Sequence, residues 1–142
     1  MTATDPRDLA GRWRFDRDVA DRLGPARHVT GTSELAVEDD GRVSWSETGT
    51  MTWEDGETPV FRHLFVEQRP DGWWVTFDDG RDFHPWSVGQ SVVHPCGADT
   101  YEGRIDVTAP DAWTVVWVVS GPAKDYTMTT RLTRDVDETR LA

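Results

Sequence analysis

The sequence predicts an all-β protein: an antiparallel up-and-down meander of about 8–10 strands, closed into a barrel, after a short N-terminal helical turn. Two observations carry this prediction. Short runs of Val, Thr, Trp, Phe and Tyr alternate with turn residues roughly every ten positions. Several turns contain Asp-Gly, and glycine readily supplies the positive φ that tight hairpins need. A barrel then hides the apolar face and removes the exposed edges.

The expected elements follow one another through short connections, so each strand is expected to pair with its neighbour in the chain. The helical turn is expected at Asp5–Ala10, where Asp5 can cap and Pro6 takes the first helical position. A sandwich is the alternative architecture, although it needs longer crossovers. The expected strands are 11–17, 28–38, 42–53, 59–68, 73–78, 81–86, 90–95, 100–108, 112–120 and 124–134.

The length of 142 residues fits one domain with a sizeable core. We therefore expect a single barrel domain over 1–142, with its core at 11–134 and a flexible acidic tail at 135–142. Trp74 falls on the opposite strand face from Trp73, so it is a candidate for a contact between copies. The sequence leaves monomer and homodimer open.

Charge and cysteine content restrict the partners. A net charge of −11 repels nucleic acid backbones and anionic lipid headgroups, so we expect no nucleic acid and no membrane partner. The apolar stretch 113–119 is far shorter than the ~20 residues that span a bilayer. Cys96 has no second cysteine to pair with, and the first residues lack a signal-peptide pattern, which favours the cytoplasm.

Strand alternation places a buried acid among apolar residues. Trp113, Val115, Trp117 and Val119 share one face of their strand, and Trp45 shares its face with Glu47. Burying an unpaired carboxylate costs several kcal/mol. Glu47 therefore needs a cation, a hydrogen-bond donor or a ligand.

A polar cluster is expected at one barrel mouth. Asp99 and Tyr101 begin an inward face on which Gly103 leaves room, and the last strand carries Lys124 and Tyr126 inward, with Arg134 at its other end. With Glu47, these groups could hold a polar ligand or tune acid–base chemistry. The alternative is an ion pair of Lys124 with Glu47 or Asp99 that merely fixes strand register.

We interpret the barrel as a binding protein for a small, partly aromatic or apolar molecule, on which a carboxylate could face Lys124. In strand 59–68, the pattern does not decide whether Arg62 or His63 points inward. The candidate ligand-binding residues are Trp45, Glu47, Arg62, His63, Phe83, His94, Asp99, Tyr101, Trp117, Lys124 and Tyr126.

Two other functions fit the same residues. A cofactor-independent cyclase, isomerase or hydrolase would use Glu47 or Asp99 as the base, while Tyr101, Tyr126 or Lys124 stabilises negative charge. A structural or regulatory partner protein would instead fill the barrel with its own tryptophans. Open volume inside the barrel distinguishes this last function from the other two.

Metal and cofactor sites are not expected. His84, His94, Cys96 and Asp99 have the chemistry of zinc ligands, but their spacing lacks a second ligand pair. The sequence also lacks a Gly-rich phosphate loop, a Gly-x-Ser-x-Gly elbow and a His-Glu-x-x-His motif. We therefore predict no metal and no cofactor.

The opening of the first strand, Gly11-Arg12-Trp13, resembles the Gly-x-Trp of lipocalins and related calycin barrels. The resemblance implies an arginine across the tryptophan, either Arg134 or Arg131. The second half of the chain resembles an uncharacterised lipocalin-like family. This resemblance implies a lipocalin-like fold but does not indicate a function. Its motifs here are Asp79-Gly80-Arg81, His94-Pro95-Cys96-Gly97-Ala98-Asp99-Thr100-Tyr101 and Gly121-Pro122-Ala123-Lys124-Asp125-Tyr126.

Overall fold

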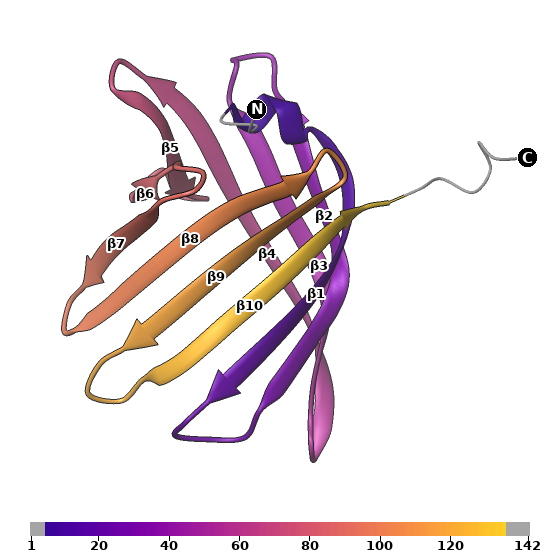
Figure 1. Cartoon of the computed structure of the whole chain (residues 1–142), viewed down its shortest axis with the longest axis vertical. Helices are drawn as coiled ribbons and strands as arrows, with labels where there is room; N and C mark the ends of the chain where they lie inside the picture. Colours follow the sequence, from indigo (N-terminus) through magenta and orange to yellow (C-terminus); the bar gives the residue numbers. More distant parts are fainter. Residues whose placement is uncertain (1–4, 136–142) are drawn as a thin grey trace, which may run out of the picture.

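The computed structural model describes residues 5–135 and shows one antiparallel sheet of ten strands, in the order β6-β5-β4-β3-β2-β1-β10-β9-β8-β7 (Figure 1). A short 3-10 helix, η1 (Pro6–Leu9), precedes it. The strands are β1 (Gly11–Asp21), β2 (Arg27–Val37), β3 (Val43–Trp53), β4 (Gly56–Arg69), β5 (Gly72–Phe77), β6 (Asp82–Pro85), β7 (Ser91–Cys96), β8 (Asp99–Ala109), β9 (Ala112–Ser120) and β10 (Asp125–Arg134).

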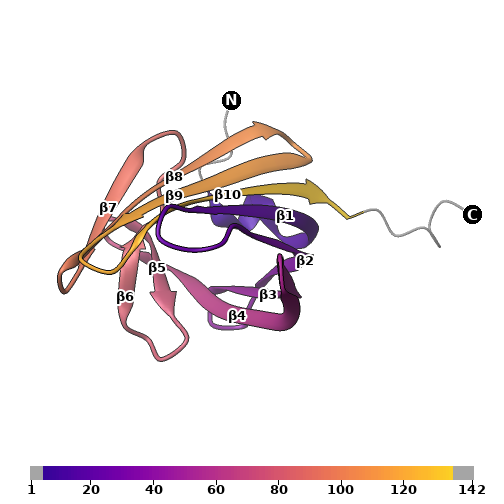
Figure 2. The same cartoon turned by 90° about the horizontal axis from the view of Figure 1, so that it is seen from below.

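The sheet curls into a nearly closed barrel, which confirms the predicted fold class. The first and last strands pair in the middle of the sheet, with Trp13 opposite Arg134. The two edge strands, β6 and β7, come together at the remaining gap, as the end-on view shows (Figure 2). A single parallel bridge, Val88 to Ile105, ties their connection to β8.

Strand boundaries differ from the expectation in places that affect the site. β1 continues past residue 17 to Asp21, and β4 begins at Gly56 instead of residue 59. β10 begins at Asp125, so Lys124 lies in the turn before it and not on an inward strand position. Asp135 is bound to the barrel, because its N–H donates to the Arg12 carbonyl. The rest of the expected flexible tail, 136–142, lies outside the described residues.

The N-terminal turn covers one end of the barrel (Figure 1). Asp5 accepts a hydrogen bond from the Arg7 N–H and caps η1. Leu9 is buried, and its carbonyl accepts a 2.8 Å hydrogen bond from the Trp13 indole. The Arg134 guanidinium lies 4.2 Å from the centre of the Trp13 ring, so the predicted arginine across the tryptophan is Arg134. Arg131 points outward and pairs with Asp18.

An aromatic floor fills the barrel beneath η1. Trp13 meets Trp113 edge-on at 5.9 Å between ring centres, and Trp45 lies 5.5 Å from Trp113. Trp86 packs against both Trp45 and Trp113. Such tilted and edge-on pairs add stability beyond the area they bury. Four of the eight tryptophans are thereby used in the core at this end.

Gly103 makes room for the Trp117 indole on the neighbouring strand. A Cβ at Gly103 would lie 2.5 Å from that ring, and real Cβ atoms do not come so close. We expect Gly103→Ala to lower the free energy of unfolding by about 2 kcal/mol through overpacking, measured by urea denaturation. Gly24→Ala is the control, because its nearest neighbour atom is 3.5 Å away. Equal stability of the two variants would contradict this packing.

Within the described residues, no helix has the length and apolar character needed to span a bilayer.

Candidate ligand-binding site

The barrel interior beyond the aromatic floor holds two adjoining cavities, one of about 310 Å³ and one of about 570 Å³. Arg62, Tyr126 and Met128 line both, so they form the shared wall. Volumes of this size fall within the ~300–1,000 Å³ of small-molecule sites. The tryptophans therefore do not fill the barrel.

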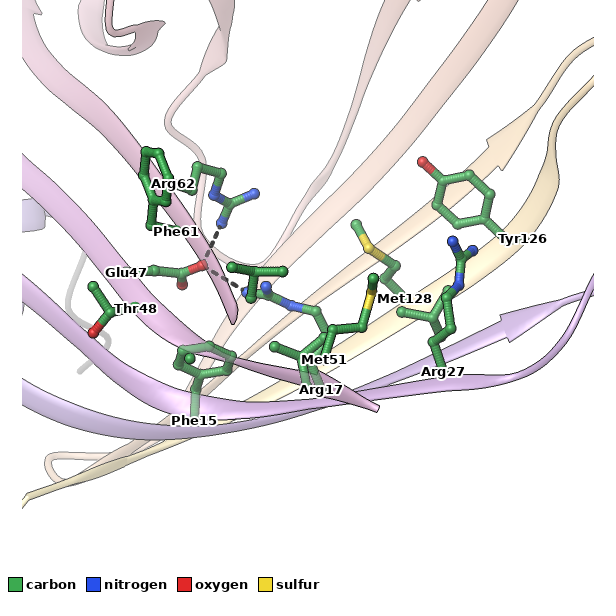
Figure 3. Close-up of a pocket in the computed structure, with 14 residues that line it drawn as sticks. Phe15, Arg17, Arg27, Glu47, Thr48, Met51, Phe61, Arg62, Tyr126 and Met128 are labelled. Carbon is green, nitrogen blue, oxygen red and sulfur yellow. Dashed lines mark hydrogen bonds and ion pairs between the residues drawn. The ribbon is translucent and has the colours of Figure 1, made fainter. Parts of the chain in front are cut away.

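An ion triad of Arg17, Glu47 and Arg62 forms one wall of the smaller cavity (Figure 3). One Glu47 carboxylate oxygen lies 2.9 Å from Arg17 Nη2 and 3.2 Å from Arg62 Nη2. Glu47 is only 4% exposed, as its place among inward apolar residues predicts. Its cationic partners come from β1 and β4, and neither is Lys124.

The two guanidinium groups keep Glu47 ionised. Burial alone raises the pKa of a carboxyl group, but the charges of Arg62 and Arg17, with a hydrogen bond from Arg17, hold the pKa of Glu47 below its usual value. Burial lowers the pKa of Arg62, and the charge of Arg17 acts in the same direction against the attraction of Glu47. The triad thus carries two positive charges and one negative charge.

A third arginine enters the same cavity from β2. Arg27 forms a 2.9 Å ion pair with Asp21, and this pair is neutral. Among the described lining residues, the cavity therefore has one guanidinium charge in excess. The excess is notable because the whole chain carries a net charge of −11.

Apolar side chains from five strands make the rest of the smaller cavity. In the close-up, Met51 and Met128 lie between the ion triad and the side chains of Arg27 and Tyr126 (Figure 3). Methionine adapts its shape to ligands more easily than branched residues do. The other apolar lining residues are Phe15, Val19, Val29, Val60 and Phe61.

The larger cavity has an aromatic wall. Phe83 stacks on Trp117 with 5.2 Å between ring centres and 9° between planes, and Phe77 stacks on the other side of Phe83 at 4.6 Å. Tyr101 meets the edge of Trp117. Flat rings in this arrangement favour another flat ring as a ligand.

The polar cluster predicted from sequence divides into two groups. Asp99, Tyr101 and Lys124 meet at the barrel rim, where Lys124 Nζ lies 3.2 Å from Asp99 and 3.0 Å from the Tyr101 hydroxyl. These contacts raise the pKa of Lys124, with the Tyr101 bond as the largest cause. Lys124 therefore pairs with Asp99 and leaves Glu47 to the arginines.

Tyr126 lies between the two groups and lines both cavities. Burial is the main cause that raises its pKa, and the Tyr101 hydroxyl adds to this effect.

The register of β4 settles which of its two candidates faces inward. Arg62 points into the lumen beside Glu47, its partner on β3. His63 has the opposite parity and packs on Phe65 and Asp78, at the edge of the larger cavity. The sequence pattern of β4 alone left both orientations open.

Four other candidates lie outside the lining described for the two cavities. Trp45 belongs to the aromatic floor and donates its indole N–H to Ser33. His94 packs against Phe83 and Tyr101 behind the larger cavity. Asp99 and Lys124 form the rim pair. Of the remaining candidates, Glu47 lines the smaller cavity, and Phe83, Tyr101 and Trp117 line the larger one.

Arg17 and Arg27 are site residues that the sequence analysis missed. Both follow from alternation, since Trp13, Phe15, Arg17 and Val19 share one face of β1. Arg17 ends the expected first strand on the same face as Trp13 and Phe15, so its inward direction was available from the sequence. Arg27 lies one residue before the expected second strand, and extending that strand by one residue places Arg27 on the face of Val29.

Possible metal ligands gather on the outer face of the barrel, where Asp16, Asp18 and His28 place their ligand atoms close together. His28 already pairs with Asp18 at 2.8 Å, and Arg131 pairs with the same carboxylate, so hydrogen bonding accounts for the group. Within the described residues, His94 and Cys96 are not part of a group that could hold a metal.

The fold and the cavities define the class: a nearly closed antiparallel barrel with an open, partly aromatic lumen. The chain belongs to the family described as Family of unknown function (DUF6314), whose model matches residues 9–134. The lipocalin-like fold expected from the sequence agrees with solved structures.

The S-type phycobiliprotein lyase CPES from Guillardia theta superposes with a TM-score of 0.63 at 14% identity, covering 92% of this chain and 90% of that one. A de novo designed fluorescence-activating β-barrel has a TM-score of 0.50 at 19% identity, with 95% and 99% covered. A redesigned barrel, mFAP1, bound to DFHBI has a TM-score of 0.51 at 16% identity, with 93% and 100% covered. None of the curated proteins matches the chain. These likenesses show the fold.

Proposed function

We propose that the protein binds a small, partly aromatic organic molecule in its lumen. The observation that carries the proposal is the pair of adjoining cavities, which join an apolar, methionine-rich chamber to a chamber walled by stacked aromatic rings. A bound molecule would lie against Met128 and Trp117, with the ion triad as its polar contact. The mFAP1 barrel, which has a similar fold, holds a small molecule, and this supports the proposal by analogy.

The other functions considered from sequence receive less support. The open lumen argues against a barrel filled by its own side chains. For the enzyme, the two acids proposed as bases are held in separate ion pairs, Glu47 with arginines and Asp99 with Lys124. Binding needs no further group beyond those present.

Nile red, a neutral dye that fluoresces in apolar surroundings, tests the proposal. We expect it to bind the purified full chain and to lose at least about tenfold in affinity in Met128→Trp, because Met128 lies in the wall that both cavities share and the larger indole narrows the space there. Val118→Trp is the matched control, since Val118 is exposed on the outer side of β9. Circular dichroism checks that both variants fold. Equal binding to the wild type and folded Met128→Trp would overturn a luminal site.

Native mass spectrometry gives an independent test of the same site. We expect the purified chain to hold one small organic molecule, either co-purified or added, and to release it on denaturation. Loss of that molecule from Met128→Trp, with retention in Val118→Trp, assigns it to the lumen. Retention of the molecule in both variants would place it elsewhere.

A further inference from the structure

We propose that the luminal ligand is an aromatic monocarboxylate, bound through its carboxylate to Arg62 and Arg17 and through its ring to the apolar chamber. This inference deepens the proposed function and depends on it. It specifies a negative charge on the ligand and the residues that bind the charged group.

The ion triad holds an uncompensated charge. Arg17 and Arg62 share one carboxylate oxygen of Glu47, so two cations are balanced by one anion in a largely buried place. Side-chain exposure is 13% for Arg17 and 4% for Glu47, while Arg62 is 35% exposed and faces the cavity. A buried charge without a partner is costly, and a ligand anion removes that cost. The other cation of the chamber, Arg27, already has Asp21.

Unused hydrogen-bond donors lie in the same chamber. The Nε–H groups of Arg62 and Arg27 are buried and have no acceptor among the described residues, and the second carboxylate oxygen of Glu47, Oε2, is buried there without a donor. A guanidinium presents its N–H groups as a planar fork that matches a carboxylate in two parallel hydrogen bonds. Arg62 offers its free Nε–H beside the triad, whereas Arg27 lies across the chamber beyond Met51 and Met128, so the ligand carboxylate is expected at Arg62 (Figure 3).

The cation at the barrel rim differs from those of the triad. Lys124 has Asp99 and the Tyr101 hydroxyl as partners, and its side chain is 44% exposed, so its charge is already balanced and hydrated. An anion gains more from the triad, because the triad has one positive charge in excess, and Arg17 and Glu47 are less exposed to water than Lys124 and Asp99 are. The ligand charge is therefore expected at Arg62 and not at Lys124.

Displacement of Nile red by two matched competitors tests the inference. Naphthoate and naphthylmethanol share a ring system and differ in charge. We expect naphthoate to displace the dye at a concentration at least about tenfold lower, a difference of about 1.4 kcal/mol. In Arg62→Met, the triad becomes a neutral Glu47–Arg17 pair, so the preference is expected to fall to about one. Arg104→Met removes the same charge from an exposed outer pair with Asp106 and is expected to keep the preference.

Each outcome decides a separate point. If Nile red binds but both competitors act equally on the wild type, the carboxylate inference is wrong while the proposed function stands. If inorganic phosphate displaces the dye as well as naphthoate does, the triad holds an inorganic anion and the aromatic acid is rejected. If Arg104→Met loses the preference as Arg62→Met does, long-range charge and not the triad explains it. If neither dye nor naphthoate binds, both proposals fail.

Discussion

Glu47→Gln is expected to lower the free energy of unfolding by about 3 kcal/mol at neutral pH, because it leaves two guanidinium groups facing each other without their carboxylate. The figure is at the lower end for breaking a buried ion pair, since the Arg62 side chain keeps 35% exposure to water. Arg62→Met is expected to cost about 1 kcal/mol or less, because Arg17 still neutralises Glu47.

The two variants are expected to differ in their free energy of unfolding, and urea denaturation of each variant measures this difference. Glu34→Gln serves as the control, because Glu34 is an exposed carboxylate at 3.9 Å from Arg12 and its loss is expected to change stability little. If Arg62→Met proves as costly as Glu47→Gln, the triad carries no excess positive charge. The inference of an anionic ligand would then lose its main support.

Local chemistry was sufficient to predict most of the fold. The Asp-Gly turns and alternating strands indicated the meander, and Asp5 with Pro6 indicated the helical turn that covers the floor. The errors lie at strand ends that carry charges. The sequence Arg17-Asp18 looks like the end of a strand, yet Asp18 points outward to His28 while Arg17 points inward to Glu47.

The inward direction of Arg62 was also within reach of the sequence. Trp53 pairs with Gly56 across the two-residue connection of the hairpin, and this register places Arg62 opposite Glu47. Gly56 and Glu57 look like turn residues, so the expected strand begins only at residue 59 and its register is lost. The length of a hairpin loop fixes the register of the two strands, and a register shift of one residue moves every side chain of the strand to the other face of the sheet.

The sequence does not predict which inward side chains contact one another across the lumen. Alternation assigns a side chain to a face, but it does not give its height along the barrel axis. Glu47 and Lys124 therefore looked like neighbours, although Glu47 lies with Arg17 inside the lumen and Lys124 lies with Asp99 at the rim. The height depends on the tilt and stagger of all ten strands together.

A loss of stability between about pH 6.5 and about pH 4 is the second large effect that we expect, and it comes from His84. This side chain on β6 is 4% exposed, contacts the Trp117 ring at 5.0 Å and shares a 2.8 Å hydrogen bond between Nδ1 and the Pro85 carbonyl. Burial lowers its pKa from 6.5 to about 4, and the charges of His94 and Arg62 act in the same direction. The Pro85 carbonyl opposes the shift without cancelling it.

The sign follows from proton binding. Below pH 6.5 the unfolded chain protonates His84, whereas the folded chain keeps it neutral until about pH 4, so acid favours unfolding. The difference amounts to about 3 kcal/mol, since one pKa unit is worth about 1.4 kcal/mol. His84→Asn keeps a donor near the Pro85 carbonyl and cannot titrate. Urea denaturation from about pH 7.5 to about pH 4.5 is expected to show a slope of stability against pH for the wild type that His84→Asn largely lacks. Equal slopes would mean that His84 titrates normally and that its surroundings beside Trp117 are hydrated.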